Sequence, residues 1–279
     1  MTDSIACLTR EQAQRYGIGI VPINILFEGK VYRDWVDITP TEAYQLFLKN
    51  PDAFATSAPS PGECLTAYGQ ASQQAESIIC ITVSAKLSST YGVALMAKEY
   101  AVKEIPGVKI EVMDSLTATA AEGLIAIAAA KAAEAGANLE EVVKIAQGVR
   151  DRVNAYILLD TLRHVYRSGR IPKIAAQVGT ILNFRALFSV SVKVHLSGIV
   201  RSRERGIELM FEKIREKVGE NPIYAAVMHA YAPEAAVQLK DRIAKEFNCL
   251  DLWLTEFSPV MGYACGTGTL AVAFYSEAS

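Results

Sequence analysis

Two clusters of hydroxyl side chains are the residues of this chain best suited to binding a small anion. Thr56 and Ser57 precede the run Ala-Pro-Ser-Pro-Gly-Glu, and further along the chain Ser88 and Ser89 precede Thr-Tyr. Each cluster is predicted to lie where a loop enters a helix. The N-terminus of a helix has unpaired N–H groups and a partial positive charge, so a hydroxyl there can cap the helix or help to hold an anion. If the two junctions face each other, they form a neutral, donor-rich carboxylate pocket; ordinary capping is the alternative for each cluster alone.

The sequence favours binding over catalysis. It contains neither the G-x-G-x-x-G pattern of dinucleotide sites nor the G-x-x-x-x-G-K-[ST] pattern of nucleotide sites. The three histidines, His164, His195 and His229, are scattered and have no partners at the spacing of a triad or a metal site. The lone G-x-G at Gly266 and Gly268 is predicted to form a tight turn before the last strand. A binding or carrier role fits these residues better than unaided catalysis.

The cysteines are predicted to be structural thiols. The chain has five, an odd number without a C-x-x-C pair, and no histidine stands near any of them at ligand spacing. They are Cys7, Cys64, Cys80, Cys249 and Cys265. No metal site is therefore expected.

Composition and charge are typical of a globular protein that binds neither nucleic acid nor anionic lipid. Of the 279 residues, 51% are hydrophobic and 21% are charged, with a net charge of −2. Asp3 lies where a signal peptide needs positive charge, so a cytoplasmic protein is expected. The apolar stretch 123–135 contains Lys131 and Glu134, which predicts a packing helix and no stable membrane insertion.

The pattern of apolar residues predicts two lobes. In the first lobe, residues 1–150, strands at 77–83 and 108–113 alternate with helices at 88–104 and 119–135, which indicates a parallel-sheet α/β lobe. A helix at 138–152 with an asparagine cap precedes the predicted boundary near residue 150.

The second lobe, residues 151–279, is predicted to be α+β. Its expected strands are 155–159, 223–228 and 270–275, its helices are 204–219 and 233–247, and a hairpin is predicted over 187–200 with its turn at Gly198.

Short segments spread along nearly the whole chain carry a family resemblance. They are residues 2–4, 16–22, 29–34, 36–39, 56–62, 84–91, 114–115, 159–162, 168–171 and 266–270. In these segments the chain resembles the DegV family, bacterial fatty-acid-binding proteins that present a fatty acid to a partner kinase. The resemblance implies one DegV-like unit with a ligand tunnel between an N-terminal α/β lobe and a C-terminal α+β lobe.

The resemblance also implies a site and a role. A long-chain fatty acid would lie in the buried tunnel, with its carboxylate held by Thr56, Ser57 and Ser88, with Ser89 beside them. Arg170 would lie near the acyl head group, although a solvated or capping arginine is an alternative. The protein would be a lipid-binding carrier without a cofactor and not itself an enzyme. It would present the carboxylate to a separate ATP-dependent fatty-acid kinase and hold the acyl phosphate for an acyltransferase of phospholipid metabolism.

Three positions depart from the family pattern, and two other functions stay open. Ala264 stands where many members have histidine, Ser89 where glycine is usual, and Ala58 where glutamine is common. The alternatives are a lipid-bound regulator of protein–protein contacts and an acyl hydrolase that uses Ser88 or Ser57 as the nucleophile.

Arg33 and Asp34 are predicted to form an ion pair within the first lobe.

Overall fold

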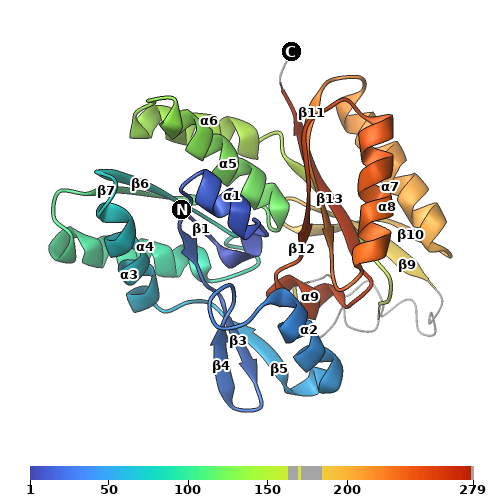
Figure 1. Cartoon of the computed structure of the whole chain (residues 1–279), viewed down its shortest axis with the longest axis horizontal. Coiled ribbons are helices and arrows are strands. Elements are labelled where there is room, and N and C mark those ends of the chain that lie inside the picture. The colour runs from blue at the N-terminus through green and yellow to red at the C-terminus, as the bar shows by residue number, and fades with distance from the viewer. Residues whose placement is uncertain (163–168, 171–183, 278–279) are drawn as a thin grey trace.

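The computed structural model describes residues 1–162, 169–170 and 184–277. The described part has two main sheets lying side by side, with a small third sheet below them in the view of Figure 1. Helices pack on both main sheets. This mixed architecture, a parallel-sheet lobe and a second lobe of sheet and helices, confirms the predicted fold class.

The first sheet is parallel and has four strands in the order β2-β1-β6-β7. The strands are β1 (Thr2–Asp3), β2 (Ile20–Val21), β6 (Ser77–Thr82) and β7 (Lys109–Asp114). The helices on its two faces are α3 (Pro61–Ser72) with α4 (Thr90–Glu104), and α5 (Ala120–Glu134) with α6 (Leu139–Arg150). The predicted alternation of strands and helices is confirmed, with small shifts at the element ends.

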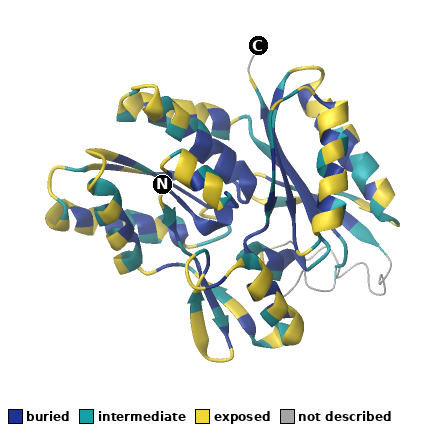
Figure 2. Cartoon of the chain, in the orientation of Figure 1, coloured by how far each residue is buried: buried dark blue, intermediate teal, exposed yellow. Residues whose placement is uncertain are grey.

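Helix α5 lies between the two main sheets. It contacts β1 and β6 of the first sheet and three strands of the second, and Figure 2 shows it largely buried. Gly123 permits its close approach to the 3-10 turn η1 (Ser4–Ala6), because a Cβ at this position would lie 2.5 Å from the carbonyl oxygen of Ala6. The stretch is therefore a packing helix, as predicted. Among the described residues, no helix has the length and apolar character needed to cross a membrane.

The second sheet has six strands in the order β10-β9-β8-β13-β11-β12. They are β8 (Asn154–Leu159), β9 (Arg185–Val190), β10 (Val194–Val200), β11 (Ile223–His229), β12 (Cys249–Glu256) and β13 (Leu270–Ser276). Only the pair β11 and β12 is parallel. Helices α7 (Arg203–Val218) and α8 (Pro233–Glu246) cover the outer face, and α5 contacts the inner one.

The predicted hairpin is present, but its turn is not at Gly198. The turn lies at residues 191–193, between β9 and β10, and Gly198 lies inside β10 next to a shift in register. A Cβ on Gly198 would be 2.5 Å from Cδ2 of Leu209 on α7. Glycine at this position therefore serves close packing between helix and strand, which the sequence pattern alone does not distinguish from a turn.

The third sheet is antiparallel, and the sequence analysis did not predict it. Its strands are β3 (Asn24–Phe27), β4 (Lys30–Arg33) and β5 (Phe54–Ser57), in the order β4-β3-β5. Helix α2 (Pro40–Lys49) and the 3-10 turn η2 (Pro51–Ala53) lie between β4 and β5 in the chain. The predicted helix start in the stretch 56–63 is present, with Ser60 as the cap of α3, whereas Thr56 and Ser57 lie before it at the end of a strand.

Two short helices complete the described structure. Helix α1 (Arg10–Arg15) follows η1, and helix α9 (Pro259–Cys265) connects β12 with β13. The strands of the second sheet all follow α6 in the chain, whereas the other two sheets lie before it. A lobe boundary near residue 150 stays a prediction.

Candidate functional site

A cavity lies where the two main sheets, the third sheet and α9 meet. Its volume is about 820 Å³ including the space open to solvent at its mouth. Most of its wall is apolar. The parts of this wall that come from the first lobe and from the second sheet include Ile5, Ile23, Val83, Ile157, Leu159 and Phe188.

The alternation of side chains along the strands gives the second sheet its cavity face. Ile157 and Leu159 lie two positions apart on β8 and both line the cavity, because successive side chains of a strand point to opposite faces. Leu158, between them, packs instead in the core under α7 and α8. One face of this sheet is therefore covered by α7 and α8, and the other packs in part on α5 and in part borders the cavity.

Three of the predicted hydroxyl residues line this cavity. Thr56 and Ser57 reach it from the end of β5, and Ser88 reaches it from the loop before α4. Oγ of Ser88 lies 2.8 Å from Oγ1 of Thr90 and accepts a hydrogen bond from the backbone N–H of Thr90 at 3.3 Å. The fold thus brings together two hydroxyl clusters that are separate in the sequence.

Ser89 does not line the cavity. It is exposed at the N-cap position of α4, where its side chain makes no capping hydrogen bond, and its carbonyl oxygen accepts the N–H of Val93. Adjacent residues at a helix start point in different directions, so Ser88 reaches the cavity and Ser89 does not. Ser89 is therefore not placed to contact a ligand in this cavity.

Arg170 is the only charged residue among the described residues that line the cavity. Its Nε donates a hydrogen bond to the carbonyl oxygen of Leu87 at 3.2 Å, which ties the guanidinium to the loop that carries Ser88. The side chain is exposed. Of the predicted motif at 168–171, Ser168 and Ile171 lie outside the described residues.

Helix α9 supplies a further part of the wall. Val260, Met261, Tyr263, Ala264 and Cys265 all line the cavity. At position 264, where the family pattern has histidine, the wall presents a methyl group, so no imidazole contact to a ligand head group is possible there. Sequence analysis missed this helix, although Ser258 followed by proline is a common helix start.

The turn after α9 has the predicted glycine geometry. Gly266 and Gly268 have φ values of 82° and 85°, which favour glycine. A Cβ on Gly268 would lie 3.0 Å from Asp160, whose carboxylate pairs with Arg185 and Arg203 at 2.9 Å. The G-x-G therefore forms a tight turn, as predicted.

The described cavity wall has no group that could activate a serine. It contains no histidine, aspartate or glutamate, and His164 lies outside the described residues. Burial raises the pKa of the Cys265 thiol to about 12, so this thiol stays protonated near neutral pH.

His229 lies on β11, and its Nδ1 accepts the N–H of Ala232 at 3.2 Å. Among the described residues, no group of three or more His, Cys, Asp or Glu side chains could hold a metal ion.

The predicted ion pair between Arg33 and Asp34 is wrong. Arg33 pairs with Asp37, with Nη2 and Oδ1 2.8 Å apart, because the tight turn after β4 brings Asp37 back to the strand. Asp34 is buried and accepts a hydrogen bond from Oγ of Ser258 at 2.6 Å. Two acids so close in sequence thus have different partners, one on the surface and one inside.

Comparisons with known proteins agree with this architecture. Residues 1–277 match the family model described as "Uncharacterised protein, DegV family". A DegV domain-containing protein of Clostridium perfringens is 29% identical over 279 residues, which cover 99% of this chain and 98% of that protein. The protein DegV of Bacillus subtilis is 25% identical and covers 98% of this chain and 97% of its own length. A solved structure described as "Fatty Acid Binding of a DegV family Protein from Thermus thermophilus" superposes on this chain with a TM-score of 0.89. The two sequences are 28% identical, and the match covers 99% of this chain and 98% of that one. The chain belongs to the DegV family.

Proposed function

We propose that this protein binds a long-chain fatty acid in the cavity between its lobes and presents the carboxylate to a separate ATP-dependent kinase. The observation that carries the proposal is a mostly apolar cavity with hydroxyl side chains from the end of β5 and from the loop before α4 at its wall. Fatty acid binding by the relative from Thermus thermophilus supports the choice of ligand.

In this proposal the hydroxyls of Thr56, Ser57 and Ser88 hold the carboxylate. Hydrogen bonds from neutral donors to a charged acceptor are strong, because charge shortens and strengthens the bond. They also avoid a buried salt bridge, whose partner charge would be left unpaired when the head group reacts or leaves. Neutral donors therefore suit a carboxylate that must be handed on.

The acyl chain supplies most of the affinity. Transfer of about fifteen methylenes out of water, at about 0.8 kcal/mol each, contributes on the order of 12 kcal/mol before the cost of ordering the complex. Side chains such as Ile157, Leu159 and Phe188 provide the apolar surface for this transfer. The tail thus determines how tightly the ligand binds, and the hydroxyls determine how it is oriented.

Arg170 would act on the head group after binding. A guanidinium is always charged and presents several donors in a plane, so it suits a carboxylate and also a phosphoryl group. In the proposal Arg170 steadies the charge that builds up when the partner kinase transfers a phosphoryl group. The acyl phosphate then stays in the cavity until an acyltransferase takes it.

Mass spectrometry of the purified protein before and after organic extraction tests the proposal. We expect a released long-chain fatty acid and no hydrolysis of ATP or of acyl esters by the chain alone. Ester hydrolysis without ATP that Ser88→Ala abolishes would instead support a serine hydrolase. Sustained ATP hydrolysis by the isolated chain, abolished by a point mutation within it, would refute the carrier role.

A further inference from the structure

The buried carboxyl of Asp34 joins the third sheet to the helix that walls the cavity. Asp34 follows β4 and is 3% exposed, and Ser258, at the N-cap of α9, is 4% exposed. Oγ of Ser258 donates to Oδ2 of Asp34 at 2.6 Å across 224 positions of sequence. Neither residue lines the cavity. Their contact is nevertheless a direct link between two parts of its frame.

Helix α9 depends on such contacts for its position. It has seven residues, which is too short for a stable helix by itself, so tertiary contacts must fix it. Its start is held at Ser258, whose Oγ accepts the N–H of Val260 and whose own N–H donates to Sγ of Cys7 at 3.4 Å. Further along, the ring of Tyr263 stacks on Phe54 with 5.7 Å between centroids.

Asp34 is itself held against the cavity frame. Its backbone N–H donates to the carbonyl oxygen of Ile23 at 2.9 Å, and the side chain of Ile23 lines the cavity. Ile23 directly precedes β3, which pairs with β5, the strand that carries Thr56 and Ser57. The buried hydrogen bond between Asp34 and Ser258 thus connects this sheet to the start of α9, in addition to the contact of Phe54 with Tyr263.

We propose that Asp34 is a positioning residue of the ligand cavity, which acts through Ser258 to hold α9 against the third sheet. The inference rests on the proposed function, because it concerns how tightly the cavity retains a fatty acid. Without this hydrogen bond, α9 and the wall that it carries separate more readily from the sheet bearing Thr56 and Ser57. A bound fatty acid then leaves faster.

The experiment measures the dissociation rate of palmitate from delipidated and reloaded protein, with albumin as the acceptor. We expect Asp34→Ala and Ser258→Ala each to raise the rate about tenfold or more, as the loss of one buried hydrogen bond to a charged group implies. The double variant should release palmitate only slightly faster than Asp34→Ala, because both residues act through one hydrogen bond. The small extra increase comes from losing the cap that Ser258 provides for α9. Asp34→Asn keeps an acceptor oxygen for Ser258 and should stay within about threefold of the native rate.

Leu239→Ala is the matched control for stability. Leu239 is buried in the core under α8 and does not line the cavity, so its truncation should lower the melting temperature without changing palmitate release. If Asp34→Ala does not fold, palmitate release is still compared between Ser258→Ala, which lacks the hydrogen bond, and Asp34→Asn, which keeps an acceptor for it.

Any of three results would overturn the inference alone. The first is native release from both Ser258→Ala and Asp34→Ala, and the second is full multiplication of the two effects in the double variant. The third is faster release from Leu239→Ala, in proportion to its lost stability. If the native protein binds neither palmitate nor oleate, the proposed function fails, and the inference fails with it.

Discussion

The two faces of the six-stranded sheet are built from the same strands but end in different environments. On the outer face, α7 and α8 pack directly on the strands, and Gly206 lets α7 approach so closely that a Cβ there would be 2.5 Å from Leu158. On the inner face, Leu159 and its neighbours border a cavity. An apolar strand pattern thus predicts burial but not what covers the strand, which is α7 and α8 on the outer face and partly α5, partly the cavity, on the inner face.

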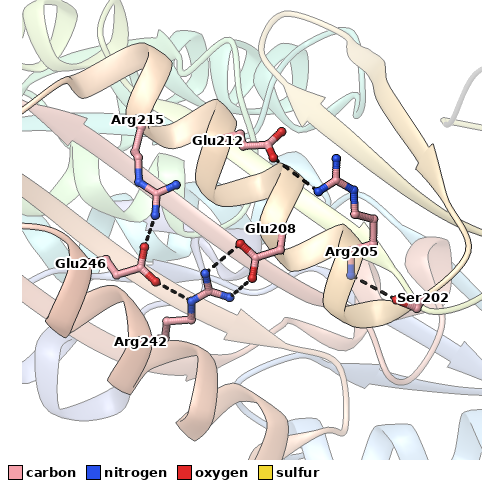
Figure 3. A network of polar contacts seen from close by, with 7 residues as sticks. All are labelled: Ser202, Arg205, Glu208, Glu212, Arg215, Arg242 and Glu246. Carbon is pink, nitrogen blue, oxygen red and sulfur yellow. Dashed lines mark hydrogen bonds and ion pairs between the residues drawn. The ribbon is translucent and has the colours of Figure 1, made fainter.

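Charged residues reinforce the contrast. Between α7 and α8, Arg242 makes two hydrogen bonds with Glu208, at 2.6 and 3.0 Å, and a third with Glu246, which also pairs with Arg215 (Figure 3). The guanidinium of Arg242 lies 4.2 Å from the ring centroid of Phe211. These charges are matched within the protein. At the cavity, Arg170 is the one charged residue among the described lining residues.

The sharpest test of the two faces compares Leu158→Ala with Leu159→Ala. Truncation of Leu158 leaves a hole in a filled core and should cost about 2–5 kcal/mol of unfolding free energy, with little change in fatty-acid affinity. Leu159 is just as buried, at 1% exposure, but its side chain lines the cavity, so its truncation should weaken binding more than that of Leu158 does. Urea denaturation and displacement of a fluorescent fatty acid measure the two quantities. Equal losses of stability and affinity for both variants would remove the distinction between the faces.

The second test uses the acids of the first lobe. Burial raises the pKa of Asp3 to about 7, although the N–H groups of Val83 and Ile5 oppose this rise. A carboxyl with a raised folded-state pKa contributes stability that is fully present below its unfolded pKa near 3.8 and is lost as pH rises through about 7. The loss amounts to a few kcal/mol, since one pKa unit is about 1.4 kcal/mol.

Asp3→Asn should therefore be less sensitive to pH between 4 and 7 than the native protein. Urea denaturation at several pH values measures the slope of unfolding free energy. Asp34, whose pKa burial raises to about 6, adds to the same slope and remains in the variant, so the slope should decrease without vanishing. An unchanged slope would show that Asp3 does not titrate in this range.

The sequence predicts the parts of this fold that local patterns determine. Asn138 and Glu141 form a reciprocal cap at the start of α6, as their spacing indicates. The strands at 77–82 and 109–114 are apolar runs of the expected length. The third sheet was not predicted, for two reasons. Thr56 and Ser57 lie in a stretch whose residue types are typical of a helix start, and the pairing of β3 with β5 joins residues about thirty positions apart.

The candidate site is predictable only in part. The sequence identifies Ser57, Ser88 and Arg170, and the structure brings them to one cavity. It does not separate Ser88 from Ser89, because which of two adjacent side chains reaches the cavity depends on the backbone at the helix start. Nor does it show that Asp34 contacts Ser258, since no local pattern encodes a contact between chain segments so far apart.

The third test sets a serine at the cavity against a serine on the outer face. Ser88→Ala should weaken fatty-acid binding by about 1.5–3 kcal/mol, the usual loss for a hydrogen bond to a charged group. Ser202, which caps α7 by accepting the N–H of Arg205 at 3.2 Å, is the control. Ser202→Ala should cost about 0.5–2 kcal/mol of unfolding free energy and leave binding unchanged. Equal affinities of the two variants would exclude Ser88 from the ligand contacts.

The fourth test separates binding from chemistry at Arg170. Arg170→Ala should change fatty-acid affinity by less than about 1 kcal/mol, because the acyl chain provides most of the binding energy. Formation of acyl phosphate with a cognate kinase at saturating fatty acid should fall more, by about tenfold or greater, because the guanidinium acts on charge that develops in the reaction. Normal acyl-phosphate formation together with a sharp loss of binding would assign Arg170 to ligand capture.

The smallest effect is expected in the charged network on the outer face. Glu208→Gln removes the charge that meets the guanidinium of Arg242, and both side chains are partly exposed, at 44% and 33%. An ion pair with this exposure contributes about 0.2–1 kcal/mol, because solvent screens the charges. Thermal unfolding in low and high salt should show a small loss of stability that shrinks as salt increases, with no change in fatty-acid binding. Since Glu246 still pairs with Arg242 in the variant, the two helices stay connected, and a loss as large as that of Leu158→Ala would mean that matched charges, and not the filled core, close the outer face.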